Sequence, residues 1–337
     1  MKKLRVAVVG LGKIAQIAHL PFLKKMEEVE IVAVCDVDEK KMSAILSKFK
    51  IPRWYNLFDE MIEKEEIDAL HICTTNHYHY PMALMALQKG IPALIEKPIA
   101  LNVADAERIA ELSAKTKVPV VVGMHNRFRD DVQLLKEFLN EKELGDLFYL
   151  KAGWLKKWTR ETLLTWETQK QYAGGGVLMD LGIQLIDMAL YLLNKPVIRS
   201  VRMFGYNIKP QFEVEDSMLA VLETADGMSM TFETSWNLHL DHDIQYQHLF
   251  GKNGSAYLNP LRIQKVLHGN LVTVTPIAEE RVRDRYLRAY ERQVRHFINV
   301  VKGEEENMSS ARDAVETMRI IDALYRSMKE GKEITLG

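Results

Sequence analysis

Hydrophobic and polar residues follow two alternating patterns along the first third of the chain. Short apolar runs rich in β-branched residues predict strands at residues 5–10, 30–36, 68–74, 93–96 and 119–124. Between these runs, apolar residues recur with the spacing of one helix face. Helices are therefore expected at residues 14–26, 39–49, 57–64, 80–89 and 103–114. Strands that are apolar on both faces and alternate with helices indicate an α/β fold with a doubly wound parallel sheet, which binds ligands at the carboxyl ends of its strands.

The rest of the chain has a different pattern, in which strands follow one another. Strands are expected at residues 147–155, 197–206, 216–224, 228–237 and 244–251. Helices are expected at residues 131–140, 176–193, 286–301 and 311–328. Glycine-containing breaks between the later strands are typical of hairpins. This order predicts an α+β domain with a large open mixed or antiparallel sheet and helices on one face. We place the domain boundary so that residues 1–124 form one domain and 125–337 the other.

Length and charge narrow the class of protein. A chain of 337 residues is long enough for two domains. It has 45 Lys and Arg against 46 Asp and Glu, a net charge of −1, so it lacks the basic excess that nucleic acids and anionic membranes attract. Cys35 and Cys73 lie in apolar runs, which favours buried thiols, and no Cys/His cluster predicts a metal site. We find neither a signal peptide nor an apolar run of membrane-spanning length, and expect a cytoplasmic protein.

A dinucleotide-binding fingerprint follows the first predicted strand. Gly10, Gly12 and Ala15 form a G-x-G-x-x-A turn that leads into a helix, with Lys13 and Ile14 at the helix start. Such a turn brings the backbone close to a pyrophosphate, and the helix N-terminus offers it free N–H groups. The second strand ends at Asp36, where a carboxylate would accept hydrogen bonds from the ribose hydroxyls and repel a 2′-phosphate, which favours NAD over NADP. The alternative is that Asp36 only caps the next helix.

Two further polar segments follow predicted strands and so lie on the ligand side of the sheet. The first runs from Thr74 through Thr75 and Asn76 to His79, and either contacts the cofactor or only caps a helix. The second is Glu96-Lys97-Pro98, in which Pro98 permits a cis bond and Glu96 and Lys97 would lie beside a nicotinamide. A partly buried Lys gives up its proton more easily than a free one, which suits acid–base chemistry on a hydroxyl.

These motifs, in this order, resemble the glucose–fructose oxidoreductase and inositol 2-dehydrogenase (Gfo/Idh/MocA) family over nearly the whole chain. Besides the segments above, the resemblance rests on the runs at residues 123–128, 174–182, 297–303 and 310–331. It implies an NAD(P)-binding Rossmann domain and a substrate-binding α+β domain whose open sheet pairs in a homodimer or homotetramer. It also implies a dehydrogenase or reductase that acts on a CH–OH group of a small sugar or polyol.

The family's catalytic Lys, Asp and His map by this resemblance onto Lys97, Asp180 and Gln184. Gln184 is a departure, because an amide binds a hydroxyl but exchanges no proton with it. Three interpretations stay open. In the first, Lys97 carries the proton transfer, Asp180 orients either Lys97 or the substrate, and Gln184 binds a hydroxyl. In the second, another histidine, His125, His239 or His242, replaces the missing one. In the third, the protein binds NAD and turns over slowly or not at all, as a regulatory protein would. An NAD-dependent lyase or hydrolase that uses transient oxidation is a further alternative.

Candidate substrate-binding residues come from aromatic and cationic side chains near the glycine run. Trp158 and Arg160 belong to a segment that is expected to face the substrate, where aromatic rings would pack on a sugar ring and the guanidinium would bind a carboxylate or phosphate. Trp166 is expected to line the same cleft, together with His125 and Gln184. The alternative for the tryptophans is a solvated loop anchored to the core.

Overall fold

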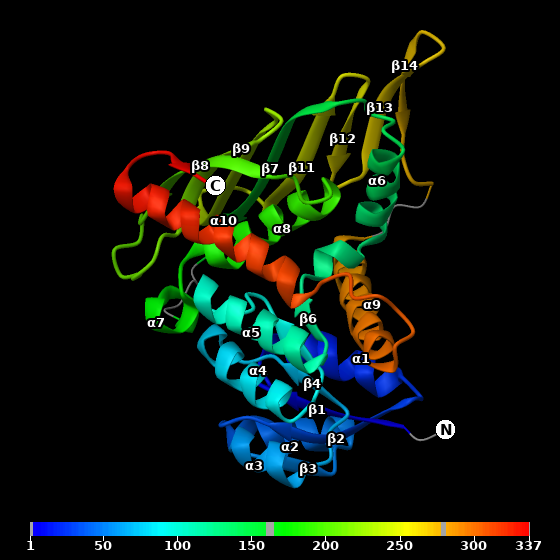
Figure 1. Ribbon diagram of the computed structural model, residues 1–337, viewed down its shortest axis with the longest axis vertical. Helices are drawn as coiled ribbons and strands as arrows, with labels where there is room; N and C mark the ends of the chain where they lie inside the picture. The colour runs from blue at the N-terminus through cyan, green and yellow to red at the C-terminus, as the bar shows by residue number, and fades with distance from the viewer. Residues whose placement is uncertain (1–2, 160–164, 278–280, 337) are drawn as a thin grey trace. The chain divides into compact units, whose positions relative to one another are not determined.

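The computed structural model describes residues 3–159, 165–277 and 281–336 and divides the chain into two compact units. The first unit comprises Met1–His125 and Tyr286–Val315, and the second comprises Asn126–Arg285 and Glu316–Gly337. The first unit therefore includes residues from near the end of the chain, so no single boundary along the sequence separates the two units. Each unit has its own β-sheet (Figure 1).

The first unit contains a six-stranded, entirely parallel sheet in the order β3-β2-β1-β4-β5-β6. Its strands are β1 (Leu4–Val9), β2 (Val29–Cys35), β3 (Arg53–Tyr55), β4 (Ala69–Ile72), β5 (Ala93–Glu96) and β6 (Val120–Gly123). This order is that of dinucleotide-binding sheets. The predicted parallel sheet is confirmed, with β3 added at its edge. That strand has three residues and no buried one, so it carries no apolar pattern to detect.

Helices cover this sheet and complete its core. They are η1 (Ala15–His19), α1 (Leu20–Lys25), α2 (Glu39–Phe49), α3 (Phe58–Lys64), η2 (Asn76–Tyr78), α4 (His79–Gln88), α5 (Val103–Thr116) and most of α9 (Val282–Lys302). The predicted helix at residues 14–26 is a π-helical turn, η1, followed by α1. In the core, Val294, Phe297 and Ile298 of α9 join Leu11 and Leu23 near the start of the chain. The late helix is thus part of the first unit's hydrophobic core.

A segment near the end of the first unit pairs with the edge strand β6. Val122 donates its N–H to the Ser309 carbonyl at 2.7 Å, and the Ser309 hydroxyl donates to the Val122 carbonyl at 2.8 Å. Ser310 and Asp313 then cap helix α10 (Ala311–Glu330) by reciprocal hydrogen bonds to each other's backbone N–H. The sheet edge is therefore closed by residues nearly two hundred positions later in the chain.

The second unit contains a nine-stranded mixed sheet in the order β14-β13-β12-β11-β7-β10-β9-β8-β15. Its strands are β7 (Leu147–Lys157), β8 (Ile198–Tyr206), β9 (Ser217–Thr224), β10 (Ser229–Leu238), β11 (Ile244–Gly251), β12 (Gly254–Leu258), β13 (Arg262–Leu267), β14 (Asn270–Val274) and β15 (Ile334–Thr335). Only β7 and β10 pair in parallel. The expected large mixed sheet is confirmed. Strands β12 to β15 were not predicted: Val266, Leu267 and Leu271 of β13 and β14 are exposed and give no alternation, and β12 and β15 have only five and two residues.

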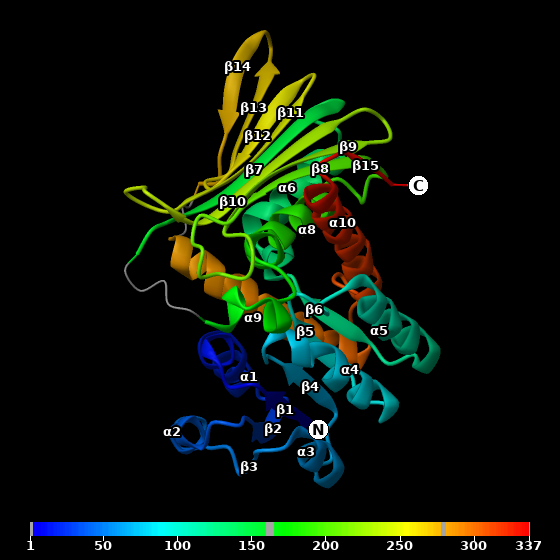
Figure 2. The ribbon, with the colours of Figure 1, turned by 90° about the vertical axis from the view of Figure 1, so that its left-hand side faces the viewer.

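Helices of the second unit lie on one face of its sheet (Figure 2). They are η3 (His125–Phe128) from residue 126, α6 (Asp130–Asn140), η4 (Trp166–Thr168), α7 (Lys170–Ala173), η5 (Leu178–Gly182), α8 (Ile183–Leu192) and α10 from residue 316. The run Lys170–Leu192 has the length and composition of a membrane span, but 89% of its most apolar window is buried inside the protein, as in a core helix. On the other face, Phe204, Tyr206, Leu219 and Val221 of β8 and β9 are exposed.

Candidate functional site

The nucleotide turn in the first unit begins at Gly10, directly after β1. Gly10 has a φ of +82°, and a Cβ at this position would lie 2.6 Å from the backbone of Cys73 and Thr74. Glycine is required here both for the turn and for the close approach of the chain after β4. The carboxyl ends of β1 and β4 therefore meet at the turn.

Gly12 faces open space, since a Cβ there would meet no atom within 4 Å. Such a space beside backbone N–H groups at the start of a helical segment fits a pyrophosphate. Lys13 is exposed and Ile14 half-buried next to it. The geometry of this turn fits the bound dinucleotide that the fingerprint predicts.

Asp36 follows β2 and lies beside the same turn. Its carboxylate accepts hydrogen bonds from the N–H groups of Leu11 at 2.6 Å and of Asp38 at 2.9 Å. Asp38, and not Asp36, accepts from the N–H of Lys40 at the start of α2. The helix-capping alternative for Asp36 is therefore not what the contacts show: Asp36 connects the end of β2 to the glycine turn.

The segment after β4 is held by His79, which is fully buried. Its Nδ1 lies 2.6 Å from the carbonyl oxygen of Pro98, and its Nε2 lies 3.1 Å from that of Thr74. Burial lowers the pKa of His79, although both carbonyls favour its charged form. Thr75 Oγ1 lies 3.1 Å from Nδ1 of His77, and Asn76 is buried. His79 thus fastens the loops after β4 and β5 to each other, and its described contacts are to protein backbone.

Glu96 and Lys97 stand at the carboxyl end of β5. The Lys97–Pro98 peptide bond is cis, and Lys97 is half-buried. Glu96 is buried, and its Oε1 lies 2.8 Å from Nε2 of His19. Burial alone would raise the pKa of Glu96, but the His19 hydrogen bond and the charges of His125 and Lys97 lower it on balance. The first unit thus brings the nucleotide turn, the loop after β4 and Lys97 to one edge of a parallel sheet.

Asp180 and Gln184 lie in the second unit, on η5 and the start of α8. Asp180 is half-buried and its Oδ2 accepts a hydrogen bond of 2.9 Å from Nε1 of Trp236 on β10. Gln184 is buried, donates to the backbone carbonyl of Asp180 at 2.9 Å and accepts from Asn126 Nδ2 at 3.4 Å. As the spacing predicts, the two residues are neighbours on one side of the helix.

The glycine run before Asp180 packs against a buried carboxylate. Glu215 accepts from the N–H groups of Gly176 and Leu178, and from the hydroxyl of Tyr325 at 2.9 Å. A Cβ on Gly176 would lie 1.9 Å from the Glu215 carbonyl oxygen. Burial raises the pKa of Glu215 although these donors stabilise its charged form. The run is glycine because this carboxylate and its strand approach the backbone so closely.

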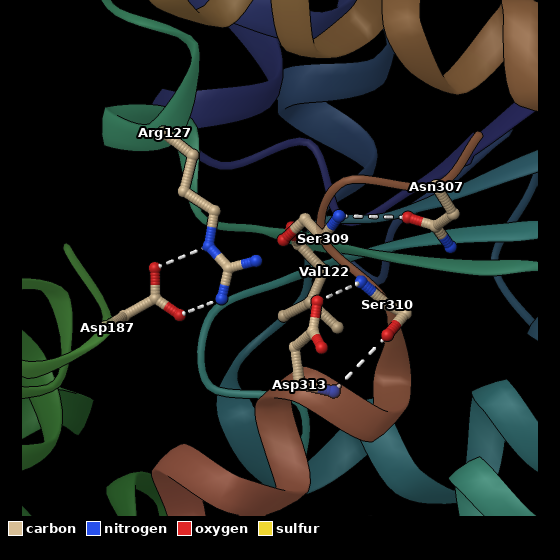
Figure 3. A network of polar contacts seen from close by, with 7 residues as sticks. All are labelled: Val122, Arg127, Asp187, Asn307, Ser309, Ser310 and Asp313. Carbon is tan, nitrogen blue, oxygen red and sulfur yellow. Dashed lines mark hydrogen bonds and ion pairs between the residues drawn. The ribbon is translucent and has the colours of Figure 1, made fainter. Parts of the chain in front are cut away.

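A buried ion pair fixes the helix that carries Gln184. Arg127 binds Asp187 through two hydrogen bonds of 2.9 and 2.6 Å, and both side chains are 2% exposed (Figure 3). A bidentate pair of this kind sets the orientation of both partners. Arg127 therefore ties the start of the second unit to α8.

The remaining predicted residues are spread over the chain. Arg160 lies outside the described residues. Trp158 is 40% exposed, with its ring 6.4 Å from that of His239, and Trp166 is half-buried on η4. His125 is buried in the first unit and stacks on Tyr290 with ring centroids 4.3 Å apart. His239 and His242 are exposed, and His242 lies 3.0 Å from Asp241. Their predicted roles stay predictions.

Sequence reasoning missed several residues that hold this machinery. Trp236, Glu215 and Tyr325 are far from Asp180 in sequence, and His19 and His71 are far from Glu96. A single sequence carries no signal for such long-range partners. His19 had one local indication, since a histidine in an apolar helical stretch needs a polar partner when it is buried.

Comparison with known proteins agrees with this geometry. Residues 4–124 match the model of an oxidoreductase family with an NAD-binding Rossmann fold, and residues 132–257 match the C-terminal domain of the same family. The chain is 29% identical to D-glucoside 3-dehydrogenase of Escherichia coli K12, over 99% of this chain and 97% of the relative. It is 24% identical to myo-inositol 2-dehydrogenase of Thermotoga maritima, over 99% of this chain and 98% of the relative.

A solved structure shares the fold over the same extent. Levoglucosan dehydrogenase in complex with NADH and levoglucosan superposes with a TM-score of 0.88 at 18% identity, covering 99% of each chain. The two family domains together cover more than half of the chain, in the order that the two sheets show. The chain therefore belongs to the Gfo/Idh/MocA family of oxidoreductases with an NAD-binding Rossmann fold.

Proposed function

We propose that this protein is an NAD-dependent oxidoreductase that interconverts a secondary alcohol and a ketone on a sugar, a polyol or a sugar-like molecule. The observation that carries the proposal is the arrangement in the first unit, where Lys97 and the nucleotide turn lie at the carboxyl edge of one parallel sheet. The curated relatives are named as dehydrogenases of glucosides and inositols, which supports a CH–OH substrate.

The choice of NAD over NADP rests on Asp36. Its carboxylate is held by backbone N–H groups beside the glycine turn, and each oxygen retains a lone pair for a ribose hydroxyl. A 2′-phosphate would meet this negative charge, with Val37, Asp38 and Glu39 following and no cation among them. Gly12, Lys13, Ile14, Thr74, Thr75 and Asn76 are proposed to complete the cofactor site, with His79 acting through the backbone carbonyls that it binds.

The proton chemistry is assigned to Lys97. A bound nicotinamide would supply the acceptor or donor of the hydride that leaves or joins the substrate carbon. Lys97 Nζ accepts the hydroxyl proton in oxidation and returns it in reduction, so that charge is balanced as the C–H and O–H bonds break. Asp180, oriented by Trp236, is proposed to orient the reacting hydroxyl, and Gln184 to bind another hydroxyl by its amide. Trp158, Trp166, His125 and Arg160 remain proposed substrate contacts.

The replacement of a catalytic histidine by Gln184 does not remove the means of proton transfer in this scheme. The amide of Gln184 already bonds the Asp180 carbonyl and Asn126, which gives it a positioning role. A catalytically silent NAD-binding protein is the alternative outcome. The presence of both Lys97 and Asp180, and the dehydrogenase relatives, favour the enzyme.

The test is to purify the protein, determine whether NAD(H) or NADP(H) co-purifies, and screen sugars, polyols and sugar acids for a change in nicotinamide absorbance. Turnover of any member of the panel is the expected result and identifies the substrate class. Bound cofactor without turnover of any compound would instead support the silent binding protein.

Three further assignments belong to this proposal. Residues 1–124 act as the NAD(P)-binding domain, and 125–337 as the substrate-binding and oligomerisation domain. A homodimer or homotetramer would cover the exposed apolar side chains of β8 and β9, namely Phe204, Tyr206, Leu219 and Val221. The compartment is proposed to be the cytoplasm. Size-exclusion chromatography with light scattering tests the assembly, and a monomer at micromolar concentration would contradict it.

A further inference from the structure

Two histidines and a carboxylate form a buried chain of contacts behind Lys97 in the first unit. His19 of η1 lies 2.8 Å from Glu96 Oε1 through its Nε2, and 2.8 Å from His71 Nδ1 through its own Nδ1. His19 and His71 are completely buried, and Glu96 is 6% exposed. The imidazole of His19 is therefore bonded at both ring nitrogens to partners on two neighbouring strands, β4 and β5.

Hydrogen-bond chemistry determines which atom carries the hydrogen between His19 and Glu96. A carboxylate only accepts, so Nε2 of His19 carries the hydrogen that reaches Glu96. The lowered pKa of Glu96 agrees with an ionised acceptor. On the other side, one of the two facing Nδ1 atoms must carry a hydrogen. Burial and the neighbouring His19 lower the pKa of His71 well below its usual value, so His71 is neutral.

The position of His19 in the chain connects this contact to the cofactor turn. η1 begins at Ala15, the last residue of the G-x-G-x-x-A fingerprint, and ends at His19. Single π-helical turns shift the helix register and occur often at functional sites. Glu96 directly precedes Lys97 at the end of β5. A path of a few residues, with one hydrogen bond in it, thus leads from the nucleotide turn to Lys97.

Glu96 has little room to move on its other side. A Cβ on Gly123 of β6 would lie only 3.1 Å from the Glu96 carboxyl group, so the neighbouring strand packs directly against it. The ionisable groups around Glu96 come from several elements: His19, Cys73, His79, Lys97, His125 and Tyr290. Among them, His19 makes the close hydrogen bond to the carboxylate.

We propose that His19 is a positioning residue for the reaction, which fixes Glu96 as an ionised carboxylate and thereby holds the neighbouring Lys97 in register with the cofactor turn. This inference rests on the proposed function of Lys97. Without the imidazole, Glu96 would be buried with its strongest described donor gone, and desolvation would favour its protonated form. The backbone at Lys97 would then lose its anchor to η1.

The experiment compares His19→Leu, which removes both ring nitrogens, with His19→Gln, whose amide keeps a donor toward Glu96. The matched control is His296→Leu. His296 is another buried histidine of the first unit, on α9, and its Nδ1 lies 2.6 Å from a carboxylate oxygen of Glu305. For each protein, kcat and kcat/KM are measured across pH with the substrate found in the panel. The rate at which an amine-specific reagent labels Lys97 is measured in parallel by mass spectrometry.

We expect kcat of His19→Leu to fall by about tenfold to a hundredfold, because a displaced reacting group loses its alignment. The acid limb of its kcat/KM profile moves up by about one pH unit as Glu96 protonates more readily. The rate at which the reagent labels Lys97 differs between His19→Leu and the unaltered protein. His19→Gln recovers most of each property, and His296→Leu lowers stability without moving the acid limb.

Two results would overturn the inference. One is an unchanged acid limb and an unchanged Lys97 labelling rate in His19→Leu. The other is an equal change in His296→Leu, which would reduce the effect to general loss of stability. If the unaltered protein turned over no compound, the proposed function of Lys97 would be refuted. The labelling rate would still show whether His19 controls this amine.

Discussion

The two units hold their proposed reactive groups with different kinds of partner. In the first unit, Lys97 follows a buried carboxylate that is bonded to one imidazole and linked through it to a second. In the second unit, Asp180 is held by an indole N–H, and Gln184 is bonded by its amide to a backbone carbonyl and to Asn126. The described contacts of Asp180 and Gln184 therefore come from an indole, an amide and a backbone carbonyl, which are not ionisable, whereas the close contact of Glu96 comes from an imidazole, which is.

This contrast separates two tasks. A network of imidazoles and a carboxylate changes its charge when a proton moves, so it suits the side of the reaction that transfers protons. Neutral donors and amides keep their charge and geometry over a wide pH range, so they suit the recognition of hydroxyl groups. We expect variants at His19 and Lys97 in the first unit to act mainly on kcat, and those at Asp180 and Gln184 mainly on substrate affinity.

The largest expected effect comes from Lys97→Ala. Removing the acid–base group should lower kcat by about 10² to 10⁴-fold, while NADH affinity measured by fluorescence titration changes little. Steady-state rates with the substrate from the panel provide the measurement. Asp180→Asn, which keeps the size and an acceptor for Trp236, is the companion variant in the second unit. If Asp180→Asn lost more of kcat than Lys97→Ala, the division of tasks would be reversed.

Arg127→Ala tests the buried ion pair that fixes helix α8 in the second unit. It leaves Asp187 buried without the guanidinium that binds it through two hydrogen bonds, at a cost of about 3–5 kcal/mol in the free energy of unfolding. Denaturant unfolding followed by circular dichroism measures the loss. The double variant Arg127→Met with Asp187→Leu should recover much of it, because no buried charge then remains. Full stability in the single variant would mean that solvent reaches this pair.

Asp36→Ala sharpens the assignment of the cofactor within the first unit. It should weaken NAD binding by about tenfold or more, since hydrogen bonds to a charged group are lost. The preference for NAD over NADP should narrow at the same time. Isothermal titration with both cofactors measures the two effects. Asp36→Asn retains an acceptor for the N–H groups of Leu11 and Asp38. It therefore distinguishes the loss of these hydrogen bonds from the loss of the negative charge. Equal use of both cofactors by the unaltered protein would refute the assignment.

The smallest expected effect is that of Gln184→His. The imidazole replaces an amide that is bonded at both ends in a buried position, so kcat/KM should fall by about threefold. The change should lie in KM. A rise in kcat would mean instead that a proton-transferring group is missing at this position, and that Lys97 does not carry the whole task.

The first unit could be predicted from sequence further than the second, for a physical reason. Parallel strands covered by helices on both faces are apolar throughout, so β1, β2, β4, β5 and β6 are evident from composition alone. Strands β13 and β14 lie at one edge of the open sheet, where side chains such as Val266 and Leu271 are exposed and give no clear alternation, and their neighbour β12 has only five residues. β15 has two residues and is defined only by its partner β8.

The candidate site divides in the same way. Gly10, Gly12 and Asp36 belong to a local motif whose spacing follows from the backbone geometry of one strand, one turn and one helix. The contact of His19 with Glu96 joins residues 77 positions apart, and that of Trp236 with Asp180 joins residues 56 positions apart. Such pairs are set by strand order and helix packing, which a pattern along one sequence does not contain.

The pairing of Ser309 with β6 affects when the first unit can complete its fold during synthesis. The bonds between Val122 and Ser309 span 187 residues, and Phe297 and Val294 fill the core of a sheet whose strands are all complete by residue 123. On the ribosome, the six strands emerge long before the helix that seals them. The nascent first unit must therefore wait, with part of its apolar surface open, until the entire intervening unit has been synthesised. Contacts so distant in sequence slow folding and expose the chain to aggregation in the interval. This architecture thus leaves the core of the first unit incomplete until α9 has been synthesised.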